Sequence, residues 1–505
     1  MNLDVVRNAK RNLIFGVISR VIAVSCPFIT KTVIQYTLGE HYLGLGSLFS
    51  AILSVLSMAE LGFSSAIVYS MYKPVAEGRT DIVNSLLNFY RKVYACVGMA
   101  VLAVGLGILP FLPRFIKGAY PTDISLTVLY IIYLGNAVIS YFMFAYMSSL
   151  IVVYQRDDVN SRTNVLVTLL LTVTQIIILT KFRNYLLFSL MMPVFTVLNN
   201  IRIAYIVRKM FPQYHCEGKI PETILADMKK QIAGTVVQRI CAVARNSFDS
   251  ICTSAFIGLT MTAKYNNYYS IIAALTSFMQ IFQSSITGGI GNHAVIKSED
   301  ENYQELKELD FVYMWISGWC TICLFCLTQP FMRLWMGDRM MLSDAALMLF
   351  CIYFYVLKIG DMRSIYTNAR GLWWQHRWRS IFEAVGNITL NFLLTKYFGI
   401  YGIISATIIT LLLINTIWGG RIVFRHYFGL KHIGDYFKYQ AGYAAVTAVL
   451  CFVTWNICEM LPVKAGVFVL PARGIICVIV PNLFYILIYR RLSYFHKLKE
   501  VLLRK

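Results

Sequence analysis

Nine charged side chains interrupt long apolar segments of this sequence. They are Arg20, Lys31, Glu60, Arg239, Arg245, Asp249, Lys358, Asp361 and Arg363. An Arg, Lys or Asp at the centre of a membrane-spanning helix costs roughly 3 kcal/mol, so such residues usually face an internal cavity or a charged partner. Because six of the nine are basic, the chemistry that they suggest is the binding of an anion inside the membrane.

Arg20 and Lys31 are the first two of these charges. They lie eleven residues apart, which is close to three helical turns and puts them on one helix face. A guanidinium suits phosphate because its planar fork donates two parallel hydrogen bonds and stays charged when partly desolvated. We interpret both residues as candidate ligands of a pyrophosphate group. The alternative is structural, with Arg20 held by backbone carbonyls or by Glu60, which is otherwise a candidate for ion coupling.

Two further pairs of charges have the spacing of neighbours on one helix face. Arg245 and Asp249 are four residues apart, and Lys358 and Asp361 are three apart, so each pair is consistent with an internal ion pair. The bases are also candidate substrate ligands, and the acids are candidates for ion coupling. Arg363 falls near the expected cytoplasmic end of its helix, where a long side chain often extends to the membrane surface.

The elements that must position these residues follow from composition. Of 505 residues, 58% are hydrophobic and only 14% are charged, and the apolar residues form blocks of about twenty, the length that crosses the hydrocarbon core. The sequence therefore predicts an all-α polytopic membrane protein. The fourteen predicted helices cover residues 12–35, 43–69, 93–113, 124–153, 163–180, 184–207, 231–257, 265–290, 309–330, 343–367, 380–395, 399–420, 439–460 and 470–489.

The distribution of Lys and Arg predicts the orientation. These residues gather at both ends of the chain and in the loops after even-numbered helices, including residues 208–230. Under the positive-inside rule both termini and these loops are cytoplasmic. This topology also accounts for most of the excess of 46 basic over 25 acidic residues, so a nucleic-acid partner is not expected.

Several classes of chemistry have no support in the sequence. No predicted loop is long enough for a folded domain, and the seven histidines fall in predicted loops or at helix ends, which weakens a membrane-embedded glycan polymerase or transferase. No Gly-rich phosphate-binding motif is present, so ATP and other cofactors are not expected. The densest cysteine group, Cys320, Cys323 and Cys326, lies in an apolar run without histidine, and we expect buried thiols rather than a metal site.

A weak internal repeat relates the two halves of the chain. Arg20 matches Arg239, and Gly39 matches Gly258, at the same spacing. Six predicted helices separate the repeats, so the two units enter the membrane from the same side and are related by an axis along the membrane normal. We therefore expect lobes at residues 1–210 and 211–430, and two appended helices with a basic tail at residues 431–505. Arg20 and Arg239 would then face a shared cavity at similar depth.

Two segments resemble a known transporter family. They are YLGLGSLFSAILSVLSMAELGFSSAIVYSMYKPVAEGRTDIVNSLLNFYRKVY at residues 42–94 and ARGLWWQHRWRSIFEAVGNITLNFLLTKYFGIYGIISATIIT at residues 369–410. Both resemble bacterial polysaccharide-transporter flippases, which export O-antigen, capsule and exopolysaccharide repeat units and belong to the multidrug/oligosaccharidyl-lipid/polysaccharide exporter superfamily. The resemblance implies two six-helix lobes around a central cavity and a V-shaped alternating-access cycle. Relatives that flip lipid II carry cationic cavity residues on the first helix, which Arg20 and Lys31 match by location.

The resemblance also implies the cargo and its surroundings. The expected cargo is an undecaprenyl-pyrophosphate-linked oligosaccharide, carried across the bacterial inner membrane. Membrane lipid, a polysaccharide polymerase and glycosyltransferases are the expected partners, and residues 439–489 are expected to border a groove for the lipid tail. One alternative is a multidrug/cation antiporter of the same superfamily, although its cavity should be rich in carboxylates. The other alternative is a membrane-embedded glycan polymerase or transferase.

Overall fold

The computed structural model describes residues 5–60, 63–222, 225, 241, 243–245, 247–461, 466, 468–492 and 494–496. The described residues form helices, turns and loops without any β-strand. They divide into an N-terminal unit, Met1–Ala263, and a C-terminal unit, Lys264–Lys505. This division follows contacts within the chain and falls inside the helix that begins at Leu259.

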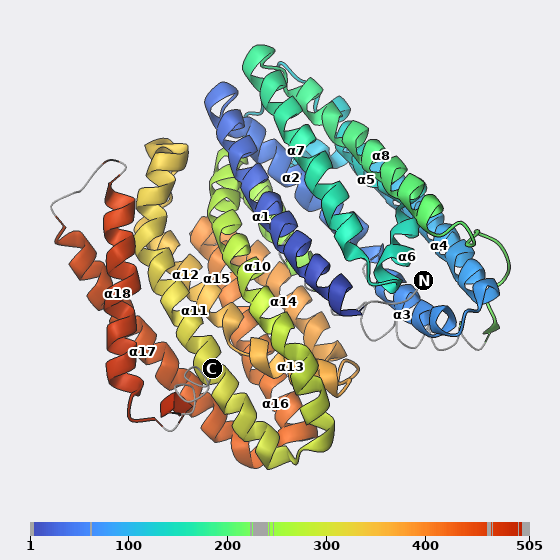
Figure 1. Ribbon diagram of the computed structural model, residues 1–505. Coiled ribbons are helices and arrows are strands. Elements are labelled where there is room, and N and C mark those ends of the chain that lie inside the picture. Colours follow the sequence, from blue (N-terminus) through green and yellow to red (C-terminus); the bar gives the residue numbers. More distant parts are fainter. Residues whose placement is uncertain are drawn as a thin grey trace. The chain divides into compact units, whose positions relative to one another are not determined.

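The N-terminal unit is a bundle of long helices (Figure 1). Its elements are α1 (Val5–Thr37), α2 (Glu40–Leu56), η1 (Ser57–Glu60), α3 (Phe63–Ala76), α4 (Thr80–Ile108), η2 (Leu109–Phe115), α5 (Leu126–Phe142), η3 (Ala145–Met147), α6 (Ser148–Val153), α7 (Asp157–Lys181) and α8 (Tyr185–Met210). Within the unit α1 packs along α7, α5 along α8, and α4 along α5. The predicted helix over 124–153 is in fact two helical segments that meet at a bend of 48°.

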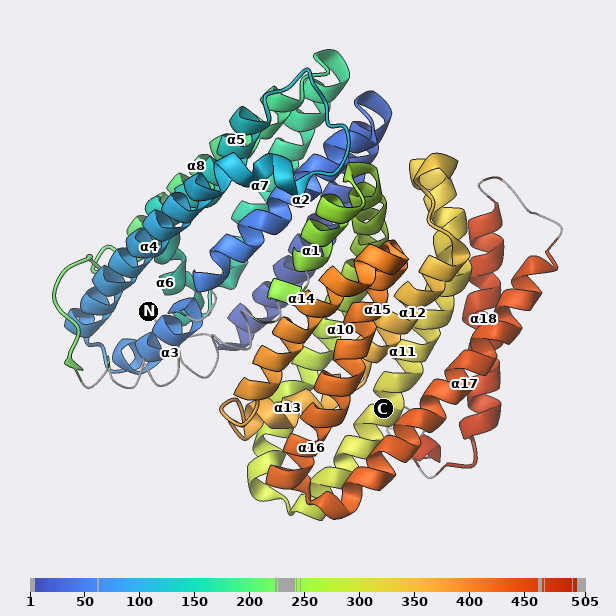
Figure 2. The ribbon, with the colours of Figure 1, turned by 180° about the vertical axis from the view of Figure 1, so that it is seen from behind.

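The C-terminal unit is also helical, and Figure 2 shows its helices from the opposite side. Its elements are α10 (Leu259–Ile296), α11 (Glu299–Met336), η4 (Asp338–Met340), α12 (Asp344–Lys358), α13 (Asp361–Ala369), α14 (Arg377–Phe398), α15 (Ile400–Thr410), η5 (Leu411–Trp418), α16 (Gly419–Val423), η6 (Phe424–Phe428), η7 (Leu430–His432), α17 (Ile433–Glu459) and α18 (Val469–Tyr489). The central helix of the packing is α11, which contacts α12, α17 and α18. The segments η5 and η6 are π-helical.

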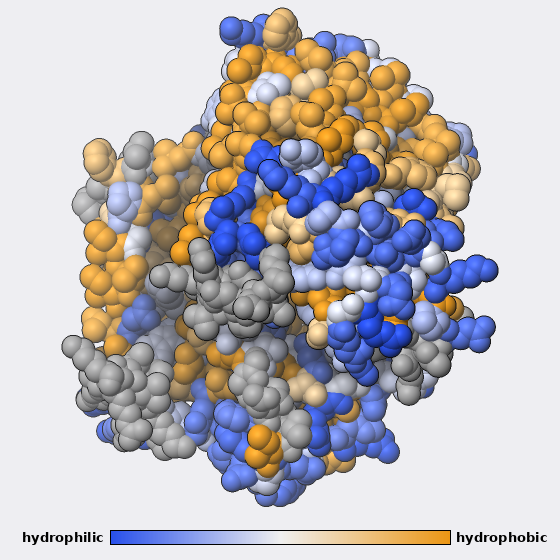
Figure 3. Space-filling model, turned by 45° about the vertical axis from the view of Figure 1, so that its right-hand side comes forward, coloured by the Kyte–Doolittle hydropathy of each residue, from blue (hydrophilic) through white to orange (hydrophobic). Residues whose placement is uncertain are grey.

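Most of the predicted helices overlap these segments. The predicted helices over 43–69 and 343–367 each cover two helices, α2 with α3 and α12 with α13, and much of the predicted helix over 231–257 lies outside the described residues. Within the described part, nine helices are long and apolar enough to cross a membrane, or ten if the bent pair α5 and α6 counts as one. Hydropathy alone omits α14, which contains charged and amide side chains. Apolar side chains cover broad areas of the surface, while hydrophilic ones gather elsewhere (Figure 3). The protein is an all-α polytopic membrane protein.

Hydrogen bonds at the two ends of the N-terminal unit tie loops to the starts of helices. At one end Tyr42 donates to Asp123 at 2.6 Å, which ties the start of α2 to the loop before α5. At the other end Asn84 accepts a 2.9 Å bond from the backbone N–H of His215, and the Asn88 amide donates to the Gly218 carbonyl at 3.0 Å. The loop after α8 is therefore held against the start of α4, at the end where the basic loops gather.

Gly39 and Gly258, paired in the sequence repeat, each precede a helix with a positive φ angle. Gly39 precedes α2 with φ 99°, and Gly258 precedes α10 with φ 129°. Side chains are disfavoured in this region of backbone conformation, so glycine suits both turns. Both glycines of the predicted repeat therefore lie at a turn directly before a helix.

A close backbone approach fixes the start of α10 in the N-terminal unit. A Cβ placed on Gly44 would overlap the backbone carbonyl of Leu259, whereas one on the exposed Gly107 of α4 would meet no atom within 4 Å. We expect Gly44→Ala to lower the free energy of unfolding by about 1–3 kcal/mol through overpacking. Gly107→Ala should be neutral or slightly stabilising, because alanine is the better helix former. Thermal unfolding of both purified variants checks this, and a Gly44→Ala protein as stable as the wild type would contradict it.

Candidate functional site

The predicted cationic residues of the N-terminal unit lie on two helical segments. Arg20 and Lys31 are half-buried on α1, and Arg245 and Asp249 are buried in the helical residues before α10. Arg239 lies outside the described residues. The backbone of Glu60 ends η1, but its side chain also lies outside the described residues. Among the described residues of the unit, Arg245 and Asp249 are therefore the buried members of the predicted set, and Arg20 and Lys31 are half-buried.

A cluster of three arginines around one carboxylate anchors the basic end of α1. The carboxylate of Asp158 is fully buried and lies 2.9 Å from both Arg11 and Arg156, and 3.8 Å from Arg162. The Asn12 side chain accepts a 2.8 Å bond from the Asp158 N–H. The start of α7 thus fixes the part of α1 that precedes Arg20. In the sequence, Arg11 served only as one of the basic residues that predict the orientation. The two acidic residues directly after Arg156 were the signal that could have predicted this cluster.

Lys358 and Asp361 form the ion pair that their spacing allowed. The Lys358 ammonium is buried and lies 3.1 Å from Asp361, which also accepts a 2.6 Å bond from the Tyr313 hydroxyl of α11. Between the two residues Gly360 has φ 98°, and α12 gives way to α13. The Gln283 amide of α10 donates to the Asp361 carbonyl at 2.9 Å. This ion pair therefore holds a break in a membrane span.

Arg363 does not extend to the membrane surface, and that interpretation was wrong. Its side chain is buried and donates to the carbonyls of Asn415 and Thr416 in the π-helical segment η5, both at 3.2 Å. A Cβ on Gly420 would come within 2.9 Å of the Arg363 guanidinium. The glycines after η5 leave room for the guanidinium, which satisfies carbonyls that an α-helix would have used itself.

Two buried carboxylates in the C-terminal unit were missed by sequence reasoning. Asp310 of α11 accepts from the Tyr439 hydroxyl at 2.9 Å and from the Gln440 amide at 3.0 Å, both on α17. Glu383 of α14 lies 2.7 Å from Arg379 and accepts a 3.3 Å bond from Asn415. Asp310 sits at the edge of its apolar run, and Glu383 in a segment of mixed polarity, so neither stood out as an isolated charge.

Glu383 begins a polar stripe along α14. Asn387, Asn391 and Thr395 follow at intervals of four residues, and all are buried. The Asn387 amide donates to the Thr407 hydroxyl of α15 at 3.0 Å, and the Asn391 amide donates to Asn387 at 3.2 Å. The opposite face of α14 exposes apolar side chains, including Phe382, Val385 and Phe392. A helix at the lipid boundary is expected to bury its polar side chains and expose its apolar ones. The four-residue spacing of the polar residues was the sequence signal that could have predicted this arrangement.

An apolar groove of about 570 Å³ lies among α11, α12, η5 and α17. Its walls include Phe325, Ile352, Leu412, Ala448, Phe452 and Trp455. Such a surface binds hydrocarbon rather than a charged group. From the range 439–489 that was expected to border a lipid-tail groove, α17 contributes side chains to it.

His376 lies outside the membrane-spanning helices, at the start of α14, and is buried. Desolvation and the nearby charges of Arg379, Arg363 and His426 lower its pKa from 6.5 to about 3. The folded protein therefore holds His376 neutral, whereas the unfolded chain takes up a proton below about pH 6.5. The neutral imidazole therefore makes its full contribution to the free energy of unfolding above about pH 6.5, and this contribution is lost as the pH falls toward 3.

We expect this histidine to make the protein acid-sensitive. Going from pH 7 to pH 5 should cost the wild type about 2 kcal/mol more than His376→Gln, which has no titrating group there. Unfolding midpoints of both purified proteins at the two pH values test this. Equal acid sensitivity in the two proteins would contradict the assignment of a neutral, buried imidazole.

Comparison with known proteins identifies the fold. No known protein-family model and no curated protein matches the sequence. Among solved structures, the chain is similar to lipid II flippase MurJ in an inward closed conformation, with a TM-score of 0.69 and 13% identity over 95% of this chain and 98% of that one. It is also similar to an inward-facing multidrug resistance MATE family transporter of the MOP superfamily, with a TM-score of 0.59 and 12% identity over 79% of this chain and 94% of that one.

A MOP superfamily transporter from Pyrococcus furiosus gives a TM-score of 0.56 and 12% identity, over 82% of this chain and 95% of that one. These similarities confirm that the chain has the fold shared by MurJ and the MATE transporters, as the resemblance of residues 42–94 and 369–410 implied.

Proposed function

We propose that this protein is a flippase that moves undecaprenyl-pyrophosphate-linked oligosaccharide repeat units from the cytoplasmic to the outer leaflet of a bacterial inner membrane. The observation that carries the proposal is the extent of the fold similarity. The MurJ structure is matched over 95% of this chain, while the MATE family transporter is matched over 79%. A MurJ-like architecture accounts for nearly the whole chain, and the drug-transporter architecture leaves a substantial part unmatched.

The cargo has two parts with opposite solvent requirements. A sugar pyrophosphate cannot cross hydrocarbon unaided, and its polyprenyl tail has no need to leave it. We assign the head group to the basic residues, with Arg20 and Lys31 of α1 as its principal ligands and Arg239 and Arg245 in support. Lys358 is assigned to the ion pair with Asp361 instead, because its ammonium is already buried against that carboxylate at 3.1 Å. The groove beside α17 is assigned to part of the lipid tail.

Transport requires two conformations that expose the head-group site to opposite leaflets, and an energy source that biases their populations. We propose alternating access for this cycle, in the service of surface polysaccharide synthesis. Deletion of the gene should then leave lipid-linked repeat units on the cytoplasmic leaflet and reduce surface glycan. Normal surface glycan with altered resistance to cationic dyes would instead identify a drug antiporter, and glycan elongation by the purified protein would identify a polymerase or transferase.

The role of Arg20 is tested by substitution. Arg20→Ala should weaken binding of a short-chain polyprenyl pyrophosphate by roughly ten- to a hundred-fold, because one charge-assisted contact contributes about 1.5–3 kcal/mol. Arg20→Lys should recover only part of this affinity, since an ammonium keeps the charge but loses the two-pronged geometry. Translocation of a lipid-linked sugar into proteoliposomes should fall in parallel.

Arg202→Ala is the matched control, because Arg202 is an exposed arginine on α8 of the same unit. It should bind and flip as the wild type does. A well-folded Arg20→Ala protein with wild-type binding and flipping would remove Arg20 from the mechanism. An Arg20→Ala protein that inserts poorly, and whose folded fraction binds normally, would assign Arg20 to structure.

The proposed orientation makes a separate prediction. Lys219 and Lys117 are exposed residues in loops at opposite ends of the N-terminal unit. In a background in which the accessible native cysteines are replaced by serine, an impermeant thiol reagent added to intact cells should label Lys117→Cys and spare Lys219→Cys. Both should react in permeabilised cells. Labelling of Lys219→Cys from outside would reject cytoplasmic termini, because an even number of spans ties the termini to that loop.

A further inference from the structure

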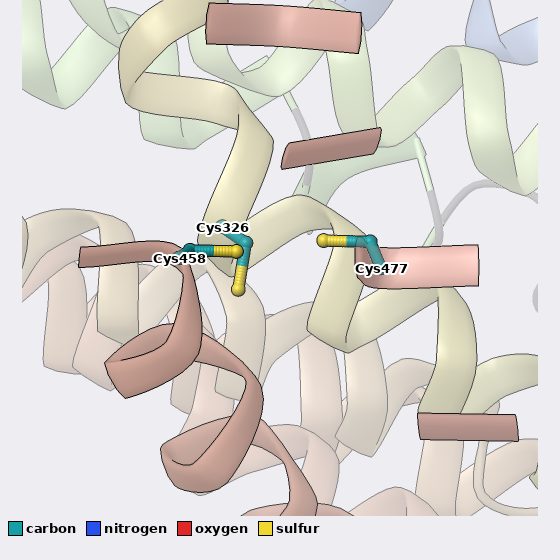
Figure 4. A group of neighbouring side chains, drawn as sticks. All are labelled: Cys326, Cys458 and Cys477. Carbon is teal, nitrogen blue, oxygen red and sulfur yellow. The ribbon is translucent and has the colours of Figure 1, made fainter. Parts of the chain in front are cut away.

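Three cysteines from distant parts of the sequence converge in the interior of the C-terminal unit. Cys326 lies on α11, Cys458 near the end of α17 and Cys477 on α18. All three are buried, and their sulfur atoms lie within 4.8 Å of one another. Figure 4 shows the Cys458 and Cys477 side chains pointing toward one another, with the Cys326 side chain beside that of Cys458. Cys320 and Cys323, their nearest companions in sequence, are not part of this group.

Arg473 links the same three helices close to the sulfur atoms. It lies one turn before Cys477 on α18, and its guanidinium donates to Glu459, the residue after Cys458, at 2.8 Å. The same guanidinium donates to the backbone carbonyl of Cys326 at 3.4 Å. One cation thus fixes the spacing of the three backbones that carry the thiols. A metal site needs such supporting contacts to hold its ligands in position.

The chemistry of this group points to a soft metal ion. Three sulfur atoms with no nitrogen or oxygen ligand select thiophilic ions and reject Mg²⁺ or Ca²⁺. A structural zinc site almost always has four protein ligands, and among the described residues this group has three. Cu(I) is the soft ion that best suits a set of three thiolates. Its complex with them is negatively charged, and the adjacent Arg473 guanidinium offsets part of that charge.

We propose that Cys326, Cys458 and Cys477 form a three-coordinate binding site for one Cu(I) ion. Each thiol that binds as a thiolate releases one proton, so binding is favoured at higher pH. The bound ion connects α17 and α18 to α11. This site is independent of the head-group ligands, because none of its residues belongs to them.

A polar pocket next to Arg473 offers a path for the ion. The pocket has a volume of about 400 Å³, and Arg333, Asp344, Glu459 and Arg473 are among its lining residues. It lies where α17 ends and α18 begins, and the ion pair of Arg473 with Glu459 forms part of its wall.

The site is tested by titrating the purified, fully reduced protein with Cu(I) against a chromophoric Cu(I) chelator, without oxygen. We expect one tightly bound ion per chain and a rise in the thermal unfolding midpoint on binding. Cys326→Ser, Cys458→Ser and Cys477→Ser should each weaken binding by at least roughly ten- to a hundred-fold, the range that loss of a supporting residue already produces. The double variant Cys320→Ser with Cys323→Ser is the matched control on α11 and should bind as the wild type does.

A second measurement needs no variant, and so remains decisive if the serine variants fold poorly. X-ray absorption at the copper edge of the loaded wild-type protein should show three sulfur neighbours and no nitrogen or oxygen neighbour. Any other set of neighbours would overturn the site. Three other results would also overturn the site. The first is wild-type Cu(I) affinity in a well-folded Cys326→Ser protein, and the second is binding of Zn(II) but not Cu(I). The third is a disulfide between two of the three cysteines in freshly isolated protein.

Discussion

A polar group inside a membrane protein has little water with which to form hydrogen bonds, and leaving it without a partner costs several kcal/mol. Much of the interior of this protein can be understood as a response to that constraint. One carboxylate oxygen of Asp310 accepts from two donors of α17, and Asn387 donates to a hydroxyl of α15. Each of these bonds joins two helices. The polar interior therefore holds the helices in register, while apolar side chains face outward.

The same constraint explains the irregular backbone of the C-terminal unit. At the break between α12 and α13, hydrogen-bonding groups are released from the helix, and Gln283 and Tyr313 bind at that point. At η5 the π-helical segment presents carbonyls that Arg363 binds. Irregular backbone at membrane depth is tolerated only where protein groups or water satisfy it. Both irregular places receive long polar side chains from other helices, so they are supported features of the fold rather than defects.

The sequence predicted the helices well because their signal is local. A run of about twenty apolar residues specifies a span wherever it occurs, and the spacing of Lys358 and Asp361 was enough to suggest their pairing. The contacts between residues far apart in the sequence have no such local signal. Nothing near Arg363 in sequence indicates that a π-helix some fifty residues later supplies its acceptors. Cys326 likewise lies more than a hundred residues before Cys458 and Cys477. The four-residue spacing of the polar side chains on α14 is visible in the sequence, but this helix was predicted from its apolar residues.

Buried cations of the C-terminal unit are already held by other groups of the protein. In the C-terminal unit Lys358 and Arg379 lie against carboxylates, and Arg363 against carbonyls, so these cations serve the packing of helices. In the N-terminal unit α1 carries Arg20 and Lys31 along a helix that exposes Ile14, Val17 and Val21. A cation already bound to a carboxylate has to give up that partner before it binds a phosphate, which lowers its net affinity. Lys358 and Arg379 are therefore poorly suited to an incoming anion. The Asp158 cluster fixes the basic end of α1, the helix to which the proposed function assigns the head-group ligands.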